Sequence, residues 1–344
     1  MALQASDIGD LVALTQRELG RMKWTDISLS LQNYTAMPNL LRTEKVEFGS
    51  GQGIQWNVQV RNAGLARNVG LYETDNVNVQ DVIVQANIPW RHTTVSYAIE
   101  RREQAMNREP ARIVELVKVR RHTALNDLAE IMEQNFWTKP TDSTDTVKPF
   151  GVPYWVVKNT STGFNGTNPS GFTSGAGNIS SSTYTAWANY TAQYTSVTKD
   201  DLIRKLRGAM TKTDFRAPNP HPNYARSGPR YGLYTNYDVL QPMEELLEAQ
   251  NQNLGNDLAS KDGQVIFRRT PVTWVPYLDS DTSDPVYGLD WSVFYPCFLS
   301  GEYMNEMVMP PSDRQHTVVN THIDNSYNFK CADRRRNFVV SLSA

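Results

Sequence analysis

Two segments between residues 45 and 99 alternate apolar and polar side chains with a period of two. The apolar positions of the first segment are Ile54, Trp56, Val58 and Val60. Those of the second are Val82, Val84, Ala86, Ile88 and Trp90. A polar stretch at 61–76 separates them. This pattern predicts two strands of a long ribbon that place their apolar residues on one face and amide side chains on the other.

An isolated two-stranded ribbon is marginally stable in water, because its apolar face stays wet. Nothing near this ribbon in the sequence looks like a third strand or a helix that would cover it. We therefore expect another molecule to cover the ribbon, foremost a second copy of the same chain.

A long uninterrupted helix is predicted next, at 109–137. It begins at Glu109–Pro110, where proline is tolerated in the first turn, and Pro140 ends it. Its apolar stripe is Ile113, Leu116, Val117, Ala124, Leu128, Ile131, Met132 and Phe136. A helix of this size is a rod of roughly 40 Å. Its charged side is predicted to face solvent, with ion pairs between subunits as the alternative; that side carries Arg112, Glu115, Lys118, Arg120 and Arg121.

The rest of the chain mixes helices and strands. Residues 6–22 have an amphipathic pattern, which predicts a surface helix or an extended arm. Residues 139–196 are rich in Gly, Ser, Thr and Asn, which predicts a long surface excursion or a β-rich insertion. Helices are predicted from Thr198 and over 237–254, with a Pro-rich turn at 218–229 between them. Strands are predicted at 231–236, 265–267, 272–277, 286–289, 292–298, 317–323, 327–329 and 337–342. This order indicates an α+β fold.

Composition narrows the classes of function. The 344 residues carry a net charge of −2, so overall charge gives no argument for binding nucleic acid or membranes. Cys297 and Cys331 are too few for a disulfide framework or a closed zinc site. The first residues include Asp7 and Asp10, unlike a signal peptide, and no apolar stretch reaches the length of a membrane span. We expect a soluble chain made in the cytosol.

Motifs of catalysis and cofactor binding are absent from the sequence. There is no G-x-S-x-G elbow, no phosphate-binding P-loop and no H-E-x-x-H zinc motif. Gly49, Gly51 and Gly53 are spaced like part of a dinucleotide loop, but a strand follows them, which favours a turn or a hinge. We predict no catalytic residue, no cofactor and no metal.

One acidic segment superficially resembles a calcium loop. Its carboxylates are Asp279, Asp281, Asp284 and Asp290. Asp284 stands where a calcium loop requires Gly, and the segment ends in Asp in place of Glu, so a solvated acidic turn is favoured. A metal-dependent hydrolase or a glycan-binding protein using this turn is the distant alternative. His316 and His322 could share one face of a strand, which is weak support for a metal.

Arg334, Arg335 and Arg336 form the one dense basic run, directly after Asp333. We expect these side chains to pair with charges between strands or between subunits. Contact with packaged nucleic acid is the alternative.

Taken in order, these segments resemble a tailed-bacteriophage major capsid protein with the Hong Kong 97-type (Johnson) fold. The most family-like pieces are Pro271–Leu278 and Asp284–Trp291. The resemblance implies an N-terminal arm at 1–44, an extended loop at 45–99 and a peripheral domain with a spine helix at 100–150. It further implies an axial domain with the Gly/Ser/Thr-rich insertion at 151–300, and C-terminal strands at 301–344 that return to the peripheral domain.

The resemblance also implies a function. Copies of the chain would form hexamers and pentamers that close an icosahedral shell around double-stranded DNA, touching the DNA without sequence preference. The ribbon's apolar residues would form contacts between subunits. Scaffolding and portal proteins, with decoration proteins as an option, would be its other partners. The chain would be no enzyme and would reside in the virion after assembly in the host cytoplasm, with no membrane contact. The close runner-up is an encapsulin, the shell protein of a bacterial nanocompartment.

Overall fold

The computed structural model of the chain describes residues 34–42, 45–62, 64, 66–71, 81–106, 110–213, 230–251, 265–311 and 316–343. For 104–106, 110–116 and 247–251 it describes the backbone only. The expected helix at 6–22, the Pro-rich turn at 218–229 and the expected helix end at 254 lie outside these residues. So does most of 63–80, the far end of the ribbon.

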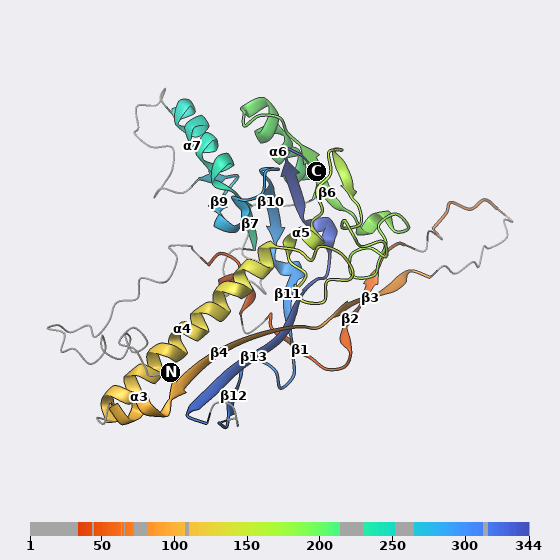
Figure 1. The fold of residues 1–344 in the computed structure, drawn as a ribbon. Helices are drawn as coiled ribbons and strands as arrows, with labels where there is room; N and C mark the ends of the chain where they lie inside the picture. Colours follow the sequence, from red (N-terminus) through yellow and green to blue (C-terminus); the bar gives the residue numbers. More distant parts are fainter. Residues whose placement is uncertain are drawn as a thin grey trace.

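Two β-sheets organise the molecule, one in an elongated lower layer and one in an upper block (Figure 1). The lower sheet has five strands: β1 (Glu47–Gly49), β4 (Arg91–Glu100), β11 (Phe294–Leu299), β12 (Asn305–Met309) and β13 (Val318–Cys331). β13 is its centre, because one half lies between β4 and β12 and the other half pairs with β11. The strands predicted at 317–323 and 327–329 are therefore one continuous strand.

The long helix is confirmed as α4 (Pro110–Trp137), which runs alongside β4 after the short helix α3 (Arg101–Met106) (Figure 1). Ala124, Leu128, Met132 and Phe136 are buried. They recur every four residues and so form one row of the helix surface. Ile131 was predicted to belong to this stripe, but it is 40% exposed, because it points about 100° away from Met132.

The charged side of α4 forms ion pairs within the chain. The Arg120 guanidinium lies 2.8 Å from Glu103 of α3, and Arg121 lies 2.5 Å from Glu306 of β12. The hydrogen bond from Arg120 lowers the pKa of Glu103 despite its burial. The prediction of a solvated face is therefore wrong for Arg120 and Arg121, which form ion pairs inside the chain. Lys118 is exposed, as predicted.

The upper sheet has seven strands: β5 (Gly163–Gly166), β6 (Asn189–Gln193), β14 (Phe338–Ser341), β10 (Val286–Asp290), β7 (Tyr231–Thr235), β9 (Thr270–Trp274) and β8 (Ile266–Phe267), in that spatial order. Helices α6 (Arg204–Lys212) and α7 (Tyr237–Asn251) pack against it with buried Leu206, Met210, Val239 and Met243. The C-terminal strand β14 lies between β6 and β10. The expected return of every C-terminal strand to the long-helix layer is therefore wrong for β14.

Residues 139–196 are interior structure for a large part and contain two strands, which contradicts the predicted surface excursion and agrees better with its alternative, a β-rich insertion. They include α5 (Val152–Trp155), β5, the turn η2 (Thr185–Trp187) and β6. Tyr154, Trp155 and Trp187 are buried. The low charge of residues 139–196 is therefore that of a packed interior segment and not of a loop in solvent. We call these residues the joint segment. The helix start at Thr198 is confirmed, because its hydroxyl accepts a hydrogen bond from the Asp201 amide.

A buried carboxylate on α4 holds the first described segment of the chain. Glu133 accepts hydrogen bonds from the backbone amides of Thr35, Ala36 and Met37 at 3.1, 2.8 and 2.8 Å, and from the Trp137 indole at 2.9 Å. These amides lead into the helix α2 (Met37–Leu40). A carboxylate is favourable at this end of a helix, because the first amides have no partner inside the helix.

Candidate subunit interface

The ribbon consists of β2 (Gly53–Gln59) and β3 (Ile83–Pro89), paired antiparallel. Ile54 lies opposite Ile88, Trp56 opposite Ala86, and Val58 opposite Val84. Directly opposed residues point to the same side of the ribbon, so the predicted apolar face is confirmed.

The ribbon is shorter than the segment 45–99 that was expected to form it. Glu47–Gly49 pair with β11, and Arg91–Glu100 pair with β13, so both flanks belong to the five-stranded sheet. Gly51 has a φ of 99° at the turn between β1 and β2. The glycines therefore mark a turn that redirects the chain from the sheet into the ribbon.

The apolar face of the ribbon is covered by the chain's own body. Ile54 and Ile88 are buried, and the Trp56 ring lies 6.0 Å from that of Trp155. The Asn87 amide donates to the Gly177 carbonyl at 3.0 Å, which binds the ribbon to the joint segment. The expectation that the chain offers no cover is wrong, because the cover comes from about 90 residues later in the sequence, in a segment expected on the surface.

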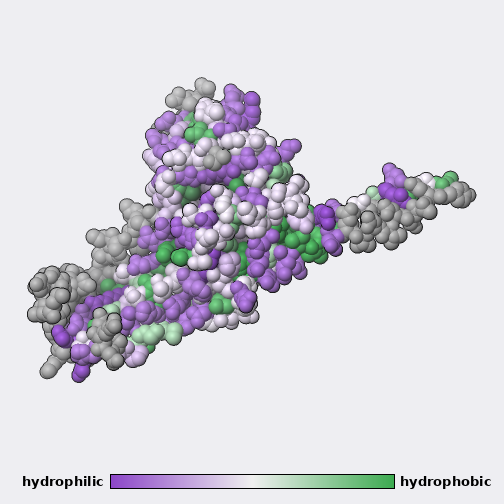
Figure 2. Space-filling view, turned by 45° about the vertical axis from the view of Figure 1, so that its right-hand side comes forward, coloured by the Kyte–Doolittle hydropathy of each residue, from purple (hydrophilic) through white to green (hydrophobic). Residues whose placement is uncertain are grey.

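The other predicted contact residues are also partly sheltered. Val60 is buried, and the half-buried residues are Trp56, Val58, Val82, Val84 and Trp90. Exposed apolar side chains lie elsewhere. Ile83 of β3 is 60% exposed, and Val69 and Leu71, in the segment between β2 and β3, are 59% and 93% exposed. Figure 2 shows apolar surface at the base of the ribbon. Near the ribbon, the described residues open to another molecule include the segment 66–71, which we call the outer part of the ribbon.

Arg334 is wholly buried, so it faces neither DNA nor another subunit. Its guanidinium donates to the carbonyl oxygens of Trp155 and Thr167 at 2.7 and 3.1 Å, and to the side-chain oxygen of Asn189 at 3.2 Å. Burial lowers the pKa of Arg334 to about 10. The prediction of a charge pair or DNA contact is wrong for this residue, which fastens α5 to the upper sheet.

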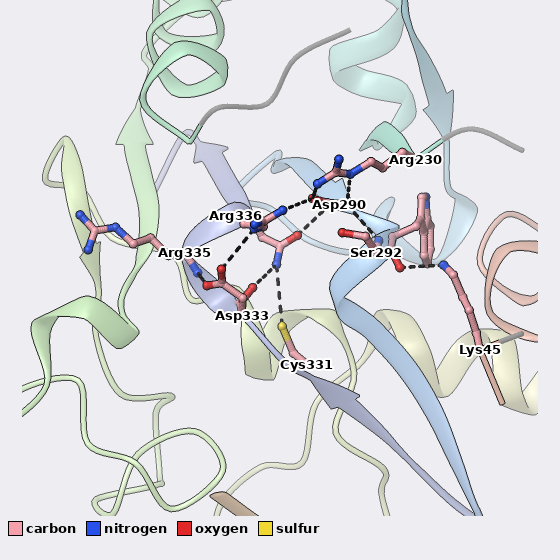
Figure 3. Close-up of polar contacts among 10 residues, drawn as sticks. Lys45, Arg230, Asp290, Ser292, Cys331, Asp333, Arg335 and Arg336 are labelled. Atoms are coloured by element: carbon pink, nitrogen blue, oxygen red, sulfur yellow. Dashed lines mark hydrogen bonds and ion pairs between the residues drawn. The ribbon is translucent and has the colours of Figure 1, made fainter. Parts of the chain in front are cut away.

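The other two arginines of the run are exposed and contact groups of the same chain. The Arg335 guanidinium lies 4.3 Å from the Phe164 ring. Arg336 lies 3.3 Å from Asp333 and 3.8 Å from Asp290, which also pairs with Arg230 at 3.1 Å (Figure 3). Charge pairing is therefore found inside the chain for Arg336.

Lys45 lies near this group and is buried (Figure 3). Its ammonium donates to the Trp291 carbonyl at 2.6 Å and lies 5.7 Å from the centre of the Trp291 ring. Burial, and to a smaller extent the charge of Arg42, lower the pKa of Lys45 to about 8 against the attraction of Asp290. The residue ties the chain that enters β1 to the aromatic core around Trp291.

The acidic segment is divided among separate structural roles. Asp279 accepts a hydrogen bond from the Tyr237 amide at 2.9 Å, Asp281 binds Lys158, and Asp284 accepts from Asn236 at 2.6 Å. Asp290 is buried, so the expectation of a solvated turn is wrong there. Across the described residues, no group of three or more His, Cys, Asp or Glu side chains is placed to hold a metal ion. His322 lies 3.0 Å from Asn320.

One exposed element was not predicted from the sequence. β12 is an outer strand of the five-stranded sheet, and Met307, Val308 and Met309 on it are 44%, 66% and 41% exposed. The run Met307-Val-Met-Pro-Pro311 was the available signal, an apolar triplet closed by two prolines. Within the described residues, no helix is long and apolar enough to cross a membrane.

Sequence comparison finds no matching family model and no matching curated protein. The structure, in contrast, is similar to solved capsids. It matches the cyanophage A-1(L) capsid asymmetric unit with a TM-score of 0.63 at 12% identity, over 93% of this chain and 95% of that one. It matches the capsid of a native GTA particle with a TM-score of 0.57 at 11% identity, over 100% of both chains. It matches Microbacterium phage Oxtober96 with a TM-score of 0.53 at 10% identity, over 99% and 98%. The described residues therefore have the α+β fold of these solved structures, in matches that cover 93% or more of the chain.

Proposed function

We propose that the chain is the major capsid protein of a tailed phage, with the Hong Kong 97-type fold, and that copies of it close an icosahedral shell around double-stranded DNA. The observation that carries the proposal is the capsid fold matched over nearly the whole of both chains. Those solved capsids favour this function over a nanocompartment shell.

The elements fit the subdivisions of that fold. The layer of α4, β4 and β13 corresponds to a peripheral domain with α4 as its spine helix, and the seven-stranded sheet with α6 and α7 to an axial domain. The paired ribbon at 53–89 corresponds to the extended loop, and the residues before β1 to the N-terminal arm. The C-terminal residues then serve both domains, because β13 lies in the first sheet and β14 in the second.

The ribbon explains how contacts between subunits would form. Its base is fixed to the body by the packing of Trp56 on Trp155 and the hydrogen bond to Gly177. A fixed base aims the outer part in one direction, and this lowers the entropy lost when the outer part binds. Val69 and Leu71 would then be buried on a second copy. Repetition around a closed shell turns weak contacts into a stable assembly.

The proposed role is structural, with no catalytic step. Identical subunits in hexamers and pentamers are the main partners, with scaffolding and portal proteins during assembly in the host cytoplasm. The exposed Arg335 and Arg336 remain candidates for contact with DNA or a neighbouring subunit, although both already contact groups of their own chain.

Electron microscopy of the expressed and purified chain tests the proposal. We expect closed icosahedral particles, produced by the chain alone or with a co-expressed scaffolding protein. Nuclease-protected DNA inside particles from infected cells would identify a phage shell. A protein cargo in place of DNA, or monomers at every concentration tried, would contradict the proposal.

A further inference from the structure

A cavity of about 880 Å³ lies where the end of α4 meets the loops at 167–170 and 277–283. This volume is within the range of ligand sites in proteins. Lys139, Lys148 and Lys158 line the cavity, whereas Asp281 is the one carboxylate side chain among the described residues that line it. The lining therefore has an excess of positive charge.

The negative charge of Asp281 is already neutralised inside the cavity. Asp281 pairs with the Lys158 ammonium, and its other oxygen accepts a hydrogen bond from the Ser283 hydroxyl at 2.6 Å. Burial alone would raise the pKa of Asp281, but the hydrogen bonds from Lys158 and Ser283 outweigh it and lower that pKa. Lys148 is exposed, so water solvates its ammonium. The positive charge that is partly buried and has no ion pair in the described part of the chain is that of Lys139.

Lys139 is partly buried, and no carboxylate among the described residues lies within ion-pair distance of its ammonium. Burial lowers its pKa, and the positive charge of Lys158 lowers it further, against the longer-range attraction of Asp281. A partly buried ammonium without an ion pair destabilises the folded chain unless an anion binds next to it. Hydroxyl groups of Ser170, Ser280 and Thr282 also line the cavity and can donate hydrogen bonds to such an anion.

We propose that this cavity binds a phosphate group, with Lys139 as its principal ligand and the surrounding hydroxyls as further donors. Inorganic phosphate offers at least three strong acceptor oxygens and up to two negative charges, which suits several donors around one uncompensated ammonium. A phosphodiester keeps two unesterified oxygens and one charge. A carboxylate offers two oxygens and one charge. The phosphate group could belong to inorganic phosphate or to a phosphodiester of nucleic acid.

Isothermal titration calorimetry of the purified, unassembled chain tests this site, with ionic strength held constant by sodium chloride. Inorganic phosphate is expected to bind saturably with one site per chain. Lys139→Gln should weaken that binding about tenfold or more, because a charge-assisted hydrogen bond is lost. Lys212→Gln is the matched control: Lys212 is exposed on α6, outside the cavity, and its loss should leave the binding unchanged.

Two further titrations separate the sources. Dimethyl phosphate binding that also depends on Lys139 would assign the site to a phosphodiester. Inorganic phosphate binding alone would assign it to a free phosphate. Acetate binding as tight as phosphate, absence of saturable binding, or an equal loss in both lysine variants would overturn the proposal. The shell proposal does not depend on these outcomes, because the titration is made on single subunits.

Discussion

Arg334 has backbone carbonyl oxygens and one side-chain amide oxygen as its partners, and no carboxylate among the described residues. Its hydrogen bonds reach Trp155, Thr167 and Asn189, which come from three separate parts of the chain. One buried guanidinium thus satisfies carbonyl groups that would otherwise stay unpaired in the interior.

Replacement of Arg334 by Met should destabilise the subunit by about 3 kcal/mol, since the buried oxygens lose their donors. Urea denaturation of the unassembled chain measures this loss. Arg335→Met is the matched control, with an expected cost below about 1 kcal/mol, because Arg335 is exposed and contacts only the face of Phe164. Equal stability of the two variants would contradict the structural role of Arg334.

Lys45 makes stability depend on pH in a defined direction. The pKa of Lys45 is about 8 in the folded chain, whereas the ordinary pKa of a lysine, which applies to the unfolded chain, is 10.5. Between these values the unfolded chain keeps a proton that the folded chain has released, so the free energy of unfolding rises with pH. The stability of the wild type relative to Lys45→Met should increase by about 2 kcal/mol from pH 8 to pH 10. Comparison with the variant removes the contribution of other titrating groups. A constant difference across this range would show that burial does not shift the lysine.

For single residues, the sequence indicates which side chains share a face, but it does not indicate which distant residues pack against that face. Alternation in the ribbon correctly places Ile54, Trp56 and Val58 together. Three consecutive arginines carry no periodic signal, so the burial of Arg334 beside exposed Arg335 could not be predicted. That difference is decided by Trp155 and Asn189, which lie more than 140 residues earlier in the chain.

The helix α2 depends on a side chain from α4. Glu133→Gln keeps one acceptor oxygen but turns an amide group toward the backbone donors of Thr35, Ala36 and Met37. We expect faster hydrogen exchange at Ala36 and Met37 and a loss of about 2 kcal/mol in stability. Asp127→Asn, at an exposed position of α4, should change neither. Unchanged exchange at Ala36 and Met37 in Glu133→Gln would contradict the anchor.

Elements with a long regular pattern are predictable from the sequence, and short or distant pairings are not. The helix α4 and the strands β2 and β3 follow periodic patterns, whereas β1 and β12 have three and five residues and depend on their partner strands. The burial of the joint segment 139–196 could not be predicted, because its Gly and Ser content resembles that of a loop. Its buried Tyr154, Trp155 and Trp187 show that a few aromatic residues decide the packing of such a segment.

The whole molecule is a body with a ribbon fixed at its base, and in the proposed shell the outer part of the ribbon contacts a neighbouring subunit. Val69 and Leu71 are exposed, so Val69→Asp with Leu71→Asp should leave the subunit folded but prevent shell formation. Substitution of Trp56 would be less informative, because Trp56 packs on the body. Val147→Asp changes an equally exposed valine away from the ribbon and should still permit shells. Circular dichroism and size-exclusion chromatography check fold and assembly. Normal shells from the ribbon variant would remove the outer ribbon from the assembly mechanism.

A cryo-electron microscopy map of particles formed by the wild-type chain tests the central claim most directly. We expect a closed icosahedral shell in which residues 66–71 of each copy lie against a neighbouring copy. We also expect Ile54 and Ile88 to remain packed on their own body. Single, unassembled subunits, or a shell whose ribbons contact no neighbour, would contradict that claim.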